Sequence, residues 1–195
     1  ASTDKEVADS VYNIPEYLCY SSTDMVNWKS EGTVMTMDTV KWAKDDQSAW
    51  ASQVAEYNGK YYLYYCSWDK TGKQSIGVAT ADSPTGPFTD IGQPLLKGNV
   101  TKPQLSSFND IDPTVWIETD ETGTTHRYLA WGNGMFFICE LNEDMISVKD
   151  QNGDGEITSG NNFAEADIAY QKNGLENYTE APWLYRRQDE DGNYY

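Results

Sequence analysis

Short runs of aromatic and β-branched residues, separated by glycine, aspartate and asparagine, recur along the chain, whereas apolar positions at helical spacing are scarce. Runs of this length between turn-forming residues are typical of β-strands. The clearest are KYYLYYCSW (Lys60–Trp68), SIGVATA (Ser75–Ala81), RYLAWG (Arg127–Gly132) and MFFICEL (Met135–Leu141). The pattern predicts an all-β chain.

Tyrosine-bearing runs repeat at a constant interval. Tyr62 in NGKYY, Tyr128 in HRYL and Tyr194 in DGNYY lie 66 residues apart each time. Each follows a hairpin turn (NGK, ETGTTH and DEDGN), and before the turn lies another predicted strand. These opening strands are WASQV (Trp50–Val54), DPTVW (Asp112–Trp116) and APWLY (Ala181–Tyr185).

Later turns complete the repeating unit. SSTDMVNW (Ser21–Trp28) and ATADSPTGPF (Ala79–Phe88) take the outer-strand position of two successive units. About four strands in a unit of roughly 60 to 70 residues are typical of propeller blades, and the unequal lengths of the units exclude a WD40 or kelch array. A sandwich or jelly roll gives no reason for this alignment. We expect one partial propeller domain over residues 1–195: the end of one blade, two nearly whole blades and the opening of another, without the remaining blades.

Charge narrows the range of partners. The 195 residues include 31 acidic and 14 basic side chains, a formal net charge of −17. Such a surface repels nucleic-acid phosphates and anionic lipid headgroups, so we expect neither nucleic acid nor membrane as a partner. A polysaccharide is neutral and has no such repulsion to overcome. Solubility alone would also explain the charge.

The cysteines and the single histidine give little sign of metal chemistry. Cys19, Cys66 and Cys139 cannot all pair, and each stands in an apolar, strand-like run, which favours buried free thiols. No Cys-x-x-Cys pair occurs, and His126 is poorly placed for zinc.

Two carboxylates stand in apolar company at the start of opening strands: Asp112 in SFNDIDPTVW and Glu180 in NYTEAPWLYRR. In a propeller the first strand of each blade lines the central channel, so both acids would converge on one cavity. Glycoside hydrolysis needs a protonated acid at the leaving oxygen and an ionised base that activates water. We expect Tyr178 and Trp183 to disfavour ionisation of Glu180 by desolvation. In the competing interpretation, an aspartate before proline only starts a turn.

These motifs resemble glycoside hydrolase family 43, five-bladed propellers that cleave arabinofuranosyl and xylosyl links. The resemblance runs from about Tyr12 to Tyr195. Ser52 departs from it, since proline is usual at that position in the family. The motifs occur in the right order: YNIPEYLCYSSTDMVNW, WASQVAEYNGKYYLYYCSW, VATADSPTGPF, NDIDPTVW, LNEDMIS, and TEAPWLYRR followed by DGNYY.

The resemblance implies an inverting enzyme with three acids. Asp112 matches the aspartate that orients the general acid and modulates its pKa, and Glu180 matches the general acid itself. The third acid, the base, belongs to an Asp-Pro motif on the opening strand of the first blade. No such motif precedes VYNIPEYLCYSS, and Asp4 and Asp9 come too late to be that base. We therefore expect this segment to lack its base and to be inactive alone.

Aromatic residues near the channel are candidates for substrate binding, because ring faces stack on sugar C–H surfaces. Trp50 opens one strand, Trp68 ends the next, and Phe108 stands just ahead of Asp112. In a chain with 7 tryptophans, core packing is the competing role.

The sequence DQNGDGEI is a weaker candidate for calcium. Asp150, Asn152, Asp154 and Gly155 match positions 1, 3, 5 and 6 of a calcium-binding loop, but position 12 is Asn161 instead of glutamate. Asn-Gly and Asp-Gly also belong at a hairpin tip, which is the alternative. We expect no cofactor to be required.

The sequence thus predicts a glycosidase for plant arabinoxylan or its oligosaccharides that releases α-L-arabinofuranose or β-xylose, with arabinofuranose favoured. A non-catalytic carbohydrate-binding propeller is the main alternative, and a purely structural interaction platform is the third. The remaining blades would come from missing sequence or another chain. The compartment, whether extracellular, periplasmic or cytoplasmic, stays open.

Overall fold

The computed structural model describes residues 5–8, 11–44, 49–98, 100–102, 108–171 and 177–192. Over these ranges the chain is all-β, and its one helical element is the 3-10 turn η1 (Met37–Thr39). A short hairpin, β1 (Lys5–Ala8) and β2 (Val11–Asn13), comes first. The all-β prediction is therefore confirmed.

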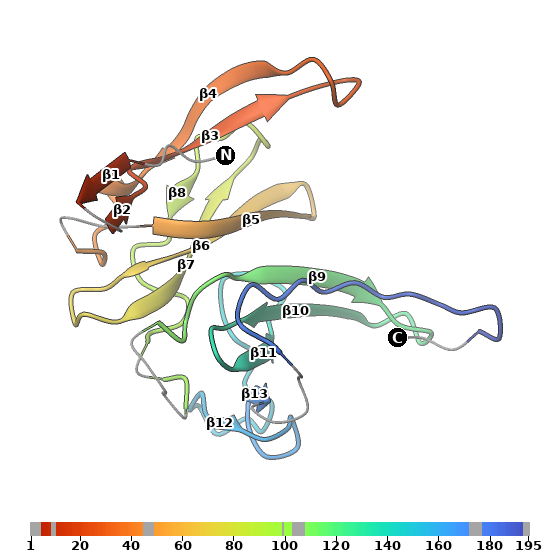
Figure 1. The fold of residues 1–195 in the computed structure, drawn as a ribbon. Helices are drawn as coiled ribbons and strands as arrows, with labels where there is room; N and C mark the ends of the chain where they lie inside the picture. Colours follow the sequence, from red (N-terminus) through yellow and green to blue (C-terminus); the bar gives the residue numbers. More distant parts are fainter. Residues whose placement is uncertain are drawn as a thin grey trace.

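Three larger antiparallel sheets follow one another down the molecule (Figure 1). The first pairs β3 (Glu16–Ser21) with β4 (Lys29–Thr36). The second contains β5 (Ala49–Tyr57), β6 (Lys60–Trp68), β7 (Gln74–Ala81) and β8 (Thr89–Asp90), in that order. The third runs β9 (Thr114–Thr119), β10 (Thr125–Trp131), β11 (Phe136–Glu140) and β13 (Ile168–Gln171), with β12 (Ser159–Gly160) parallel at its outer edge.

The two complete sheets have the order expected of propeller blades. Their first strands, β5 and β9, contact each other, so they lie on a shared inner side. The turn at Asn58 and Gly59 has φ values of 52° and 76°, the left-handed backbone that a tight Asn-Gly hairpin requires. Tyr62 on β6 and Tyr128 on β10 each pair with the opening strand of their own sheet, as the repeat predicts.

The third predicted opening strand is wrong. Residues Ala181–Tyr185 form no strand, because Ala181 has φ 59°, outside the β region. Trp183 and Tyr185 are 69% and 68% exposed, so the described residues pack little against this segment. The segment instead runs alongside β9 in Figure 1, and an ion pair from Arg186 to Glu118 (3.1 Å) ties it to that strand.

The rings of β6 build the core on both of its faces. Side chains alternate along a strand, so Tyr62 and Tyr64 face the third sheet while Leu63 and Tyr65 face the first. Burying each large side chain stabilises the fold by roughly 1.5–3 kcal/mol relative to exposure. The continuous apolar run of β6 thus reflects a strand that lies between two neighbouring blades.

Two buried tyrosine hydroxyls are hydrogen-bonded, one across the blades and one within its own blade. The hydroxyl of Tyr64 donates to the carbonyl of Met145 (2.7 Å), in the LNEDMIS turn of the next blade. The hydroxyl of Tyr65 donates to Asp90 Oδ2 (2.6 Å), within its own blade. Each tyrosine therefore buries its ring in the core while its hydroxyl keeps a hydrogen-bond acceptor.

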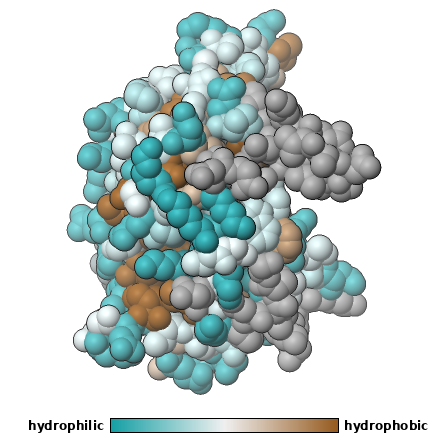
Figure 2. Space-filling model, turned by 90° about the vertical axis from the view of Figure 1, so that its left-hand side faces the viewer, coloured by the Kyte–Doolittle hydropathy of each residue, from teal (hydrophilic) through white to brown (hydrophobic). Residues whose placement is uncertain are grey.

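The three cysteines are free. Cys66 and Cys139 are fully buried, as the apolar runs predict, and Cys19 is partly exposed. On the face drawn in Figure 2, hydrophilic side chains predominate and hydrophobic ones form small separate patches. No helix in the described part of the chain is long and apolar enough to cross a membrane.

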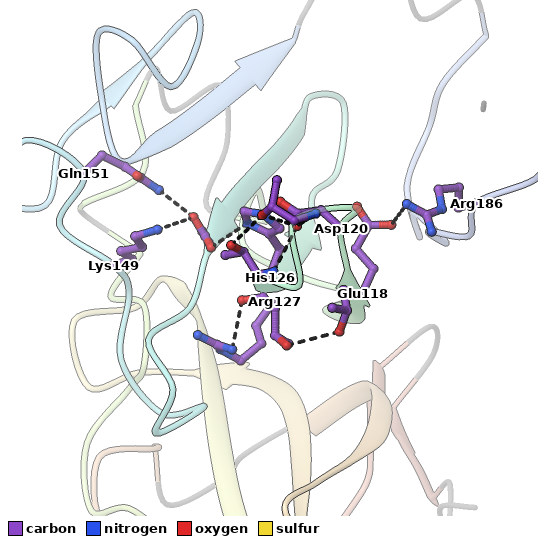
Figure 3. A network of polar contacts seen from close by, with 12 residues as sticks. Glu118, Asp120, His126, Arg127, Lys149, Gln151 and Arg186 are labelled. Carbon is purple, nitrogen blue, oxygen red and sulfur yellow. Dashed lines mark hydrogen bonds and ion pairs between the residues drawn. The ribbon is translucent and has the colours of Figure 1, made fainter. Parts of the chain in front are cut away.

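A charged network braces the hairpin of β9 and β10 (Figure 3). His126 lies between two carboxylates, with Nε2 3.2 Å from Asp120 and Nδ1 3.0 Å from Glu140. Glu140 also pairs with Lys149 (2.8 Å). The hydrogen bond to Asp120, and then that to Glu140, raise the pKa of His126 against the opposing effect of its desolvation. The histidine thus serves as an ion-pair partner, and the described residues contain no cluster of three or more His, Cys, Asp or Glu side chains suited to a metal.

Candidate active site

Asp112 lies in the loop that leads into β9, with φ 58°. Aspartate is one of the few residues other than glycine that adopts this left-handed backbone at low cost. Its carboxyl is half-buried. Burial, followed by the charge of nearby Glu180, raises the pKa of Asp112 to about 6, while the backbone N–H of Ala181 partly offsets the shift. The structure therefore brings the two predicted acids together.

Glu180 is held against the turn between β10 and β11. It forms an isolated antiparallel bridge with Asn133, and Gly134 N–H donates to the carbonyl of Thr179 (2.7 Å). Asn133 Nδ2 donates to Glu180 Oε2 at 2.6 Å.

The prediction that apolar neighbours desolvate Glu180 is wrong for this chain. Glu180 is exposed, and Trp183, three residues further along the chain, is itself 69% exposed. Tyr178 is partly buried, but its hydroxyl donates to the carbonyl of Gly132 (3.0 Å). The buried member of the carboxyl pair is Asp112.

The turn between β10 and β11 joins the two acid-bearing segments. Gly132 N–H donates to the carbonyl of Ile111 (3.0 Å), the residue before Asp112. Asn109 Nδ2 donates to the carbonyl of Asn133 at 2.8 Å, and Asn109 is only 1% exposed. One turn thus bonds the Glu180 carboxyl directly and the loop that leads to Asp112 through Ile111 and Asn109.

Asn109, Asn133 and Asp110 are site residues that the sequence interpretation missed. Asn133 could have been found from the sequence GNG between two predicted strands, because glycines on both sides of a polar residue indicate a tight turn that presents its side chain. Asp110 is buried, which raises its pKa to about 6, and it accepts a hydrogen bond from Trp131 Nε1 at 2.8 Å. Trp131 is fully buried, so this pair supports the loop beneath Asp112.

The three rings predicted to bind substrate form one cluster. Trp50 and Phe108 stack with centroids 5.7 Å apart and an interplanar angle of 3°. Trp68 meets Phe108 edge-on at 4.9 Å and Trp50 at 6.4 Å. Phe108 is 40% exposed, and the other two are partly buried. The cluster therefore has an accessible edge as well as a packed interior.

The ring cluster adjoins the loop of Asp112. The buried Cys66 thiol lies against the backbone N–H groups of Asp112 and Trp50, and burial raises its pKa to about 12. Gln53, on the opening strand β5, spans to β9, where its side chain hydrogen-bonds the backbone N–H and carbonyl of Val115. These contacts connect the aromatic cluster of one blade with the acid-bearing loop of the next.

The loop with Asp150, Asn152 and Asp154 is closed by its own backbone. Asp150 accepts hydrogen bonds from the N–H groups of Gly153 (2.6 Å) and Gly155 (2.7 Å). Asn152 Nδ2 donates to Asp154 Oδ2 (3.0 Å). These hydrogen bonds within the loop are those of a turn, so its carboxylates act as turn formers.

The prediction that the chain lacks its catalytic base involves Asp4 and Asp9, which the sequence places too late in the blade. Both lie outside the described residues. Of the acids that the sequence predicts, Asp112 and Glu180 meet at this site in the described part of the chain, with Asp110 buried in the same loop.

Comparison with known proteins shows the family of the chain. The family model for glycosyl hydrolases family 43 matches residues 4–195. A β-D-galactofuranosidase of Aspergillus niger is 32% identical over 90% of this chain and 46% of its own length. An arabinoxylan arabinofuranohydrolase of Paenibacillus polymyxa is 38% identical over 59% of this chain and 18% of its own.

Solved structures agree. An α-L-arabinofuranosidase of Clostridium thermocellum matches with a TM-score of 0.57 and 34% identity, covering 75% of this chain and 47% of that enzyme. A GH43 enzyme of Xanthomonas citri complexed with xylotriose matches in fold with a TM-score of 0.63 and 22% identity, over 96% of this chain and 58% of its own. The chain thus spans about half the length of the Aspergillus niger relative and of the two solved enzymes, and 18% of the Paenibacillus polymyxa relative. It has the propeller fold that the repeat predicted and the family resemblance specified as five-bladed, and it belongs to glycosyl hydrolases family 43.

Proposed function

We propose that the protein containing this chain is an inverting glycoside hydrolase of plant hemicellulose, arabinoxylan or its oligosaccharides, which releases terminal α-L-arabinofuranose or β-xylose. The observation that carries the proposal is the pairing of Asp112 with Glu180, in which burial and the second carboxylate raise the pKa of Asp112 to about 6. Two interacting carboxyls with different degrees of burial are what acid catalysis at a glycosidic oxygen uses.

In this mechanism Glu180 donates a proton to the leaving oxygen. Its exposed side chain is within reach of a substrate, whereas half-buried Asp112 is better suited to orient the acid than to touch the sugar. Cleavage by single displacement also needs a base that activates water from the opposite side of the ring. The family resemblance assigns that base to the opening strand of the first blade, so the complete propeller would carry all three acids.

Sugar binding falls to Trp50, Trp68 and Phe108. The accessible edge of this cluster lies beside the loop of Asp112, and an aromatic surface next to the acids suits the C–H face of a pentose ring. The substrate would be a neutral oligosaccharide or polysaccharide, and the acidic chain has no electrostatic barrier against it. The remaining blades, from further sequence or another chain, would complete the cavity.

The choice of sugar rests on names of relatives. A Humicola insolens relative is a xylosidase/arabinosidase, and two bacterial relatives are arabinoxylan arabinofuranohydrolases. We favour α-L-arabinofuranose. Galactofuranose, the substrate named for the Aspergillus niger relative, is the third sugar to compare.

No cofactor takes part in this mechanism. Calcium at Asp150, Asn152 and Asp154 rests on ligand spacing alone. Calcium titration, followed by thermal unfolding, tests it: a rise in Tm that is lost in Asp150→Ala supports a site, and an unchanged Tm removes it.

The activity test uses the full-length protein. It compares release of 4-nitrophenol from the α-L-arabinofuranoside, the β-D-xyloside and the β-D-galactofuranoside, with the anomer of the first-formed sugar followed by proton NMR. We expect release from the arabinofuranoside or xyloside with inversion. Absence of release from all three, or retention of configuration, would overturn the proposal.

A further inference from the structure

The turn between β10 and β11 has a fixed shape. Gly132 has φ 138°, and a Cβ at this position would lie 1.9 Å from the carbonyl oxygen of Met135. Only glycine fits there, so the turn cannot widen or shift without breaking contacts. The residue after Gly132 is Asn133, which forms the isolated bridge with Glu180. The fixed turn therefore holds Asn133 in one orientation.

Asn133 is anchored from the side that carries Asp112. Its carbonyl accepts from Asn109 Nδ2 (2.8 Å), a side chain that is 1% exposed and three residues before Asp112. Gly132 N–H binds the carbonyl of Ile111 in the same segment (3.0 Å). The position of Asn133 therefore follows that of the Asp112 loop.

The side chain of Asn133 then reaches Glu180. Nδ2 donates to Oε2 at 2.6 Å, and within the described part of the chain no other group hydrogen-bonds the Glu180 carboxyl. A free glutamate side chain retains about 1.5–2 kcal/mol of rotamer freedom, which this bond restricts. Because a carbonyl-type oxygen is the better acceptor for the amide N–H, this bond favours Oε2 as the unprotonated oxygen and Oε1 as the site of the acidic proton.

We propose that Asn133 is a positioning residue that orients Glu180 and directs its acidic proton to Oε1. This inference rests on the proposed function, since it assigns a role through the acid. Asn133 itself touches no reacting atom. It transmits the geometry of the Asp112 loop to Glu180, so that both carboxyls keep one relative orientation.

The test uses the dependence of cleavage on the leaving group, in the full-length protein. From a 2,4-dinitrophenyl glycoside the leaving group is dinitrophenolate, which departs without a proton. The sugar that leaves from an oligosaccharide must receive one. In Asn133→Ala we expect kcat/KM to fall roughly 10- to 100-fold for the oligosaccharide and less than about threefold for the dinitrophenyl glycoside. A merely structural defect would slow both substrates equally, and that result, or no loss on either, would overturn the inference.

Two further variants complete the experiment. Asn133→Asp keeps the side-chain shape and replaces the donor by a carboxylate. It should show the same selective loss at neutral pH, with recovery as the pH falls and the two carboxyls share a proton; an unchanged pH profile would contradict the inference even if Asn133→Ala fails to fold. Asn27→Ala is the matched control, since Asn27 Nδ2 donates to Asp24 Oδ2 at 2.7 Å in a remote turn, and it should change neither substrate.

Glu180→Gln separates the two proposals. If it shows the leaving-group selectivity and Asn133→Ala does not, only the role of Asn133 fails. If Glu180→Gln cleaves the oligosaccharide as fast as the unchanged protein, the proposed function itself fails in its choice of acid.

Discussion

Replacing Asp112 by asparagine should stabilise the protein at neutral pH while impairing its activity. Asparagine has the same shape and adopts the left-handed backbone at φ 58° readily, so the substitution introduces no strain. Its amide oxygen still faces the backbone N–H of Ala181. What the substitution removes is a charge that is half-buried and lies near a second carboxylate.

The size of the effect follows from the pKa of Asp112. The folded-state pKa, about 6, lies above the ordinary aspartate pKa of 3.8 expected in the unfolded chain, so the folded state binds the proton more tightly. The ionised carboxyl therefore destabilises the fold above about pH 6, and this cost vanishes below the unfolded pKa. A difference of about 2 pKa units corresponds to about 3 kcal/mol, and solvent screening of a half-buried group reduces this to about 1–2 kcal/mol.

Urea denaturation followed by tryptophan fluorescence measures the effect in the full-length protein. Asp112→Asn should raise the free energy of unfolding by about 1–2 kcal/mol at pH 7.5, and by about half as much at pH 5.0. Loss of stability at pH 7.5, or the same gain at both pH values, would refute the assignment of a strained, buried charge to Asp112.

Three further predictions concern the fold that carries the site. Tyr64→Phe removes the buried donor to the carbonyl of Met145 and should cost about 1–3 kcal/mol in urea denaturation; an unchanged midpoint would contradict the bond. In Gly77→Ala the new Cβ would stand 2.5 Å from the ring of Tyr65, so thermal unfolding should show a loss of about 1–3 kcal/mol, and a neutral result would mean that this ring moves aside without cost. The raised pKa of His126 means that its stabilisation is complete below about pH 6.5 and is lost as the pH rises through the folded-state pKa, so His126→Ala should destabilise more at pH 5.5 than at pH 8.5; equal losses would contradict its charged role.

The strands that depend on local pattern could be predicted from the sequence. The run Lys60–Trp68 coincides with β6, because the Asn-Gly turn fixes its start and the alternating rings are buried on both faces. The convergence of Asp112 and Glu180 was also predicted, since it follows from the repeat and the family motifs.

Features that depend on contacts between distant segments could not be predicted. Trp183 is three residues after Glu180 in sequence but is exposed, and of the two acids Asp112 is the more buried. Asn133 and Asn109 acquire their importance from partners 47 and 24 residues away, which no local pattern reveals. The predicted strand Ala181–Tyr185 fails because a left-handed Ala181 and exposed rings oppose it.

The central claim is that Glu180 acts as an acid on a bound sugar. Its most direct test is Glu180→Gln in the full-length protein, with turnover of an arabinoxylan oligosaccharide and calorimetric affinity for the same ligand measured side by side. Acid catalysis predicts that kcat falls about 10²- to 10⁴-fold while Kd changes by less than about threefold. Retained turnover, or loss of affinity without a selective loss of kcat, would contradict the account and favour a propeller that only binds carbohydrate.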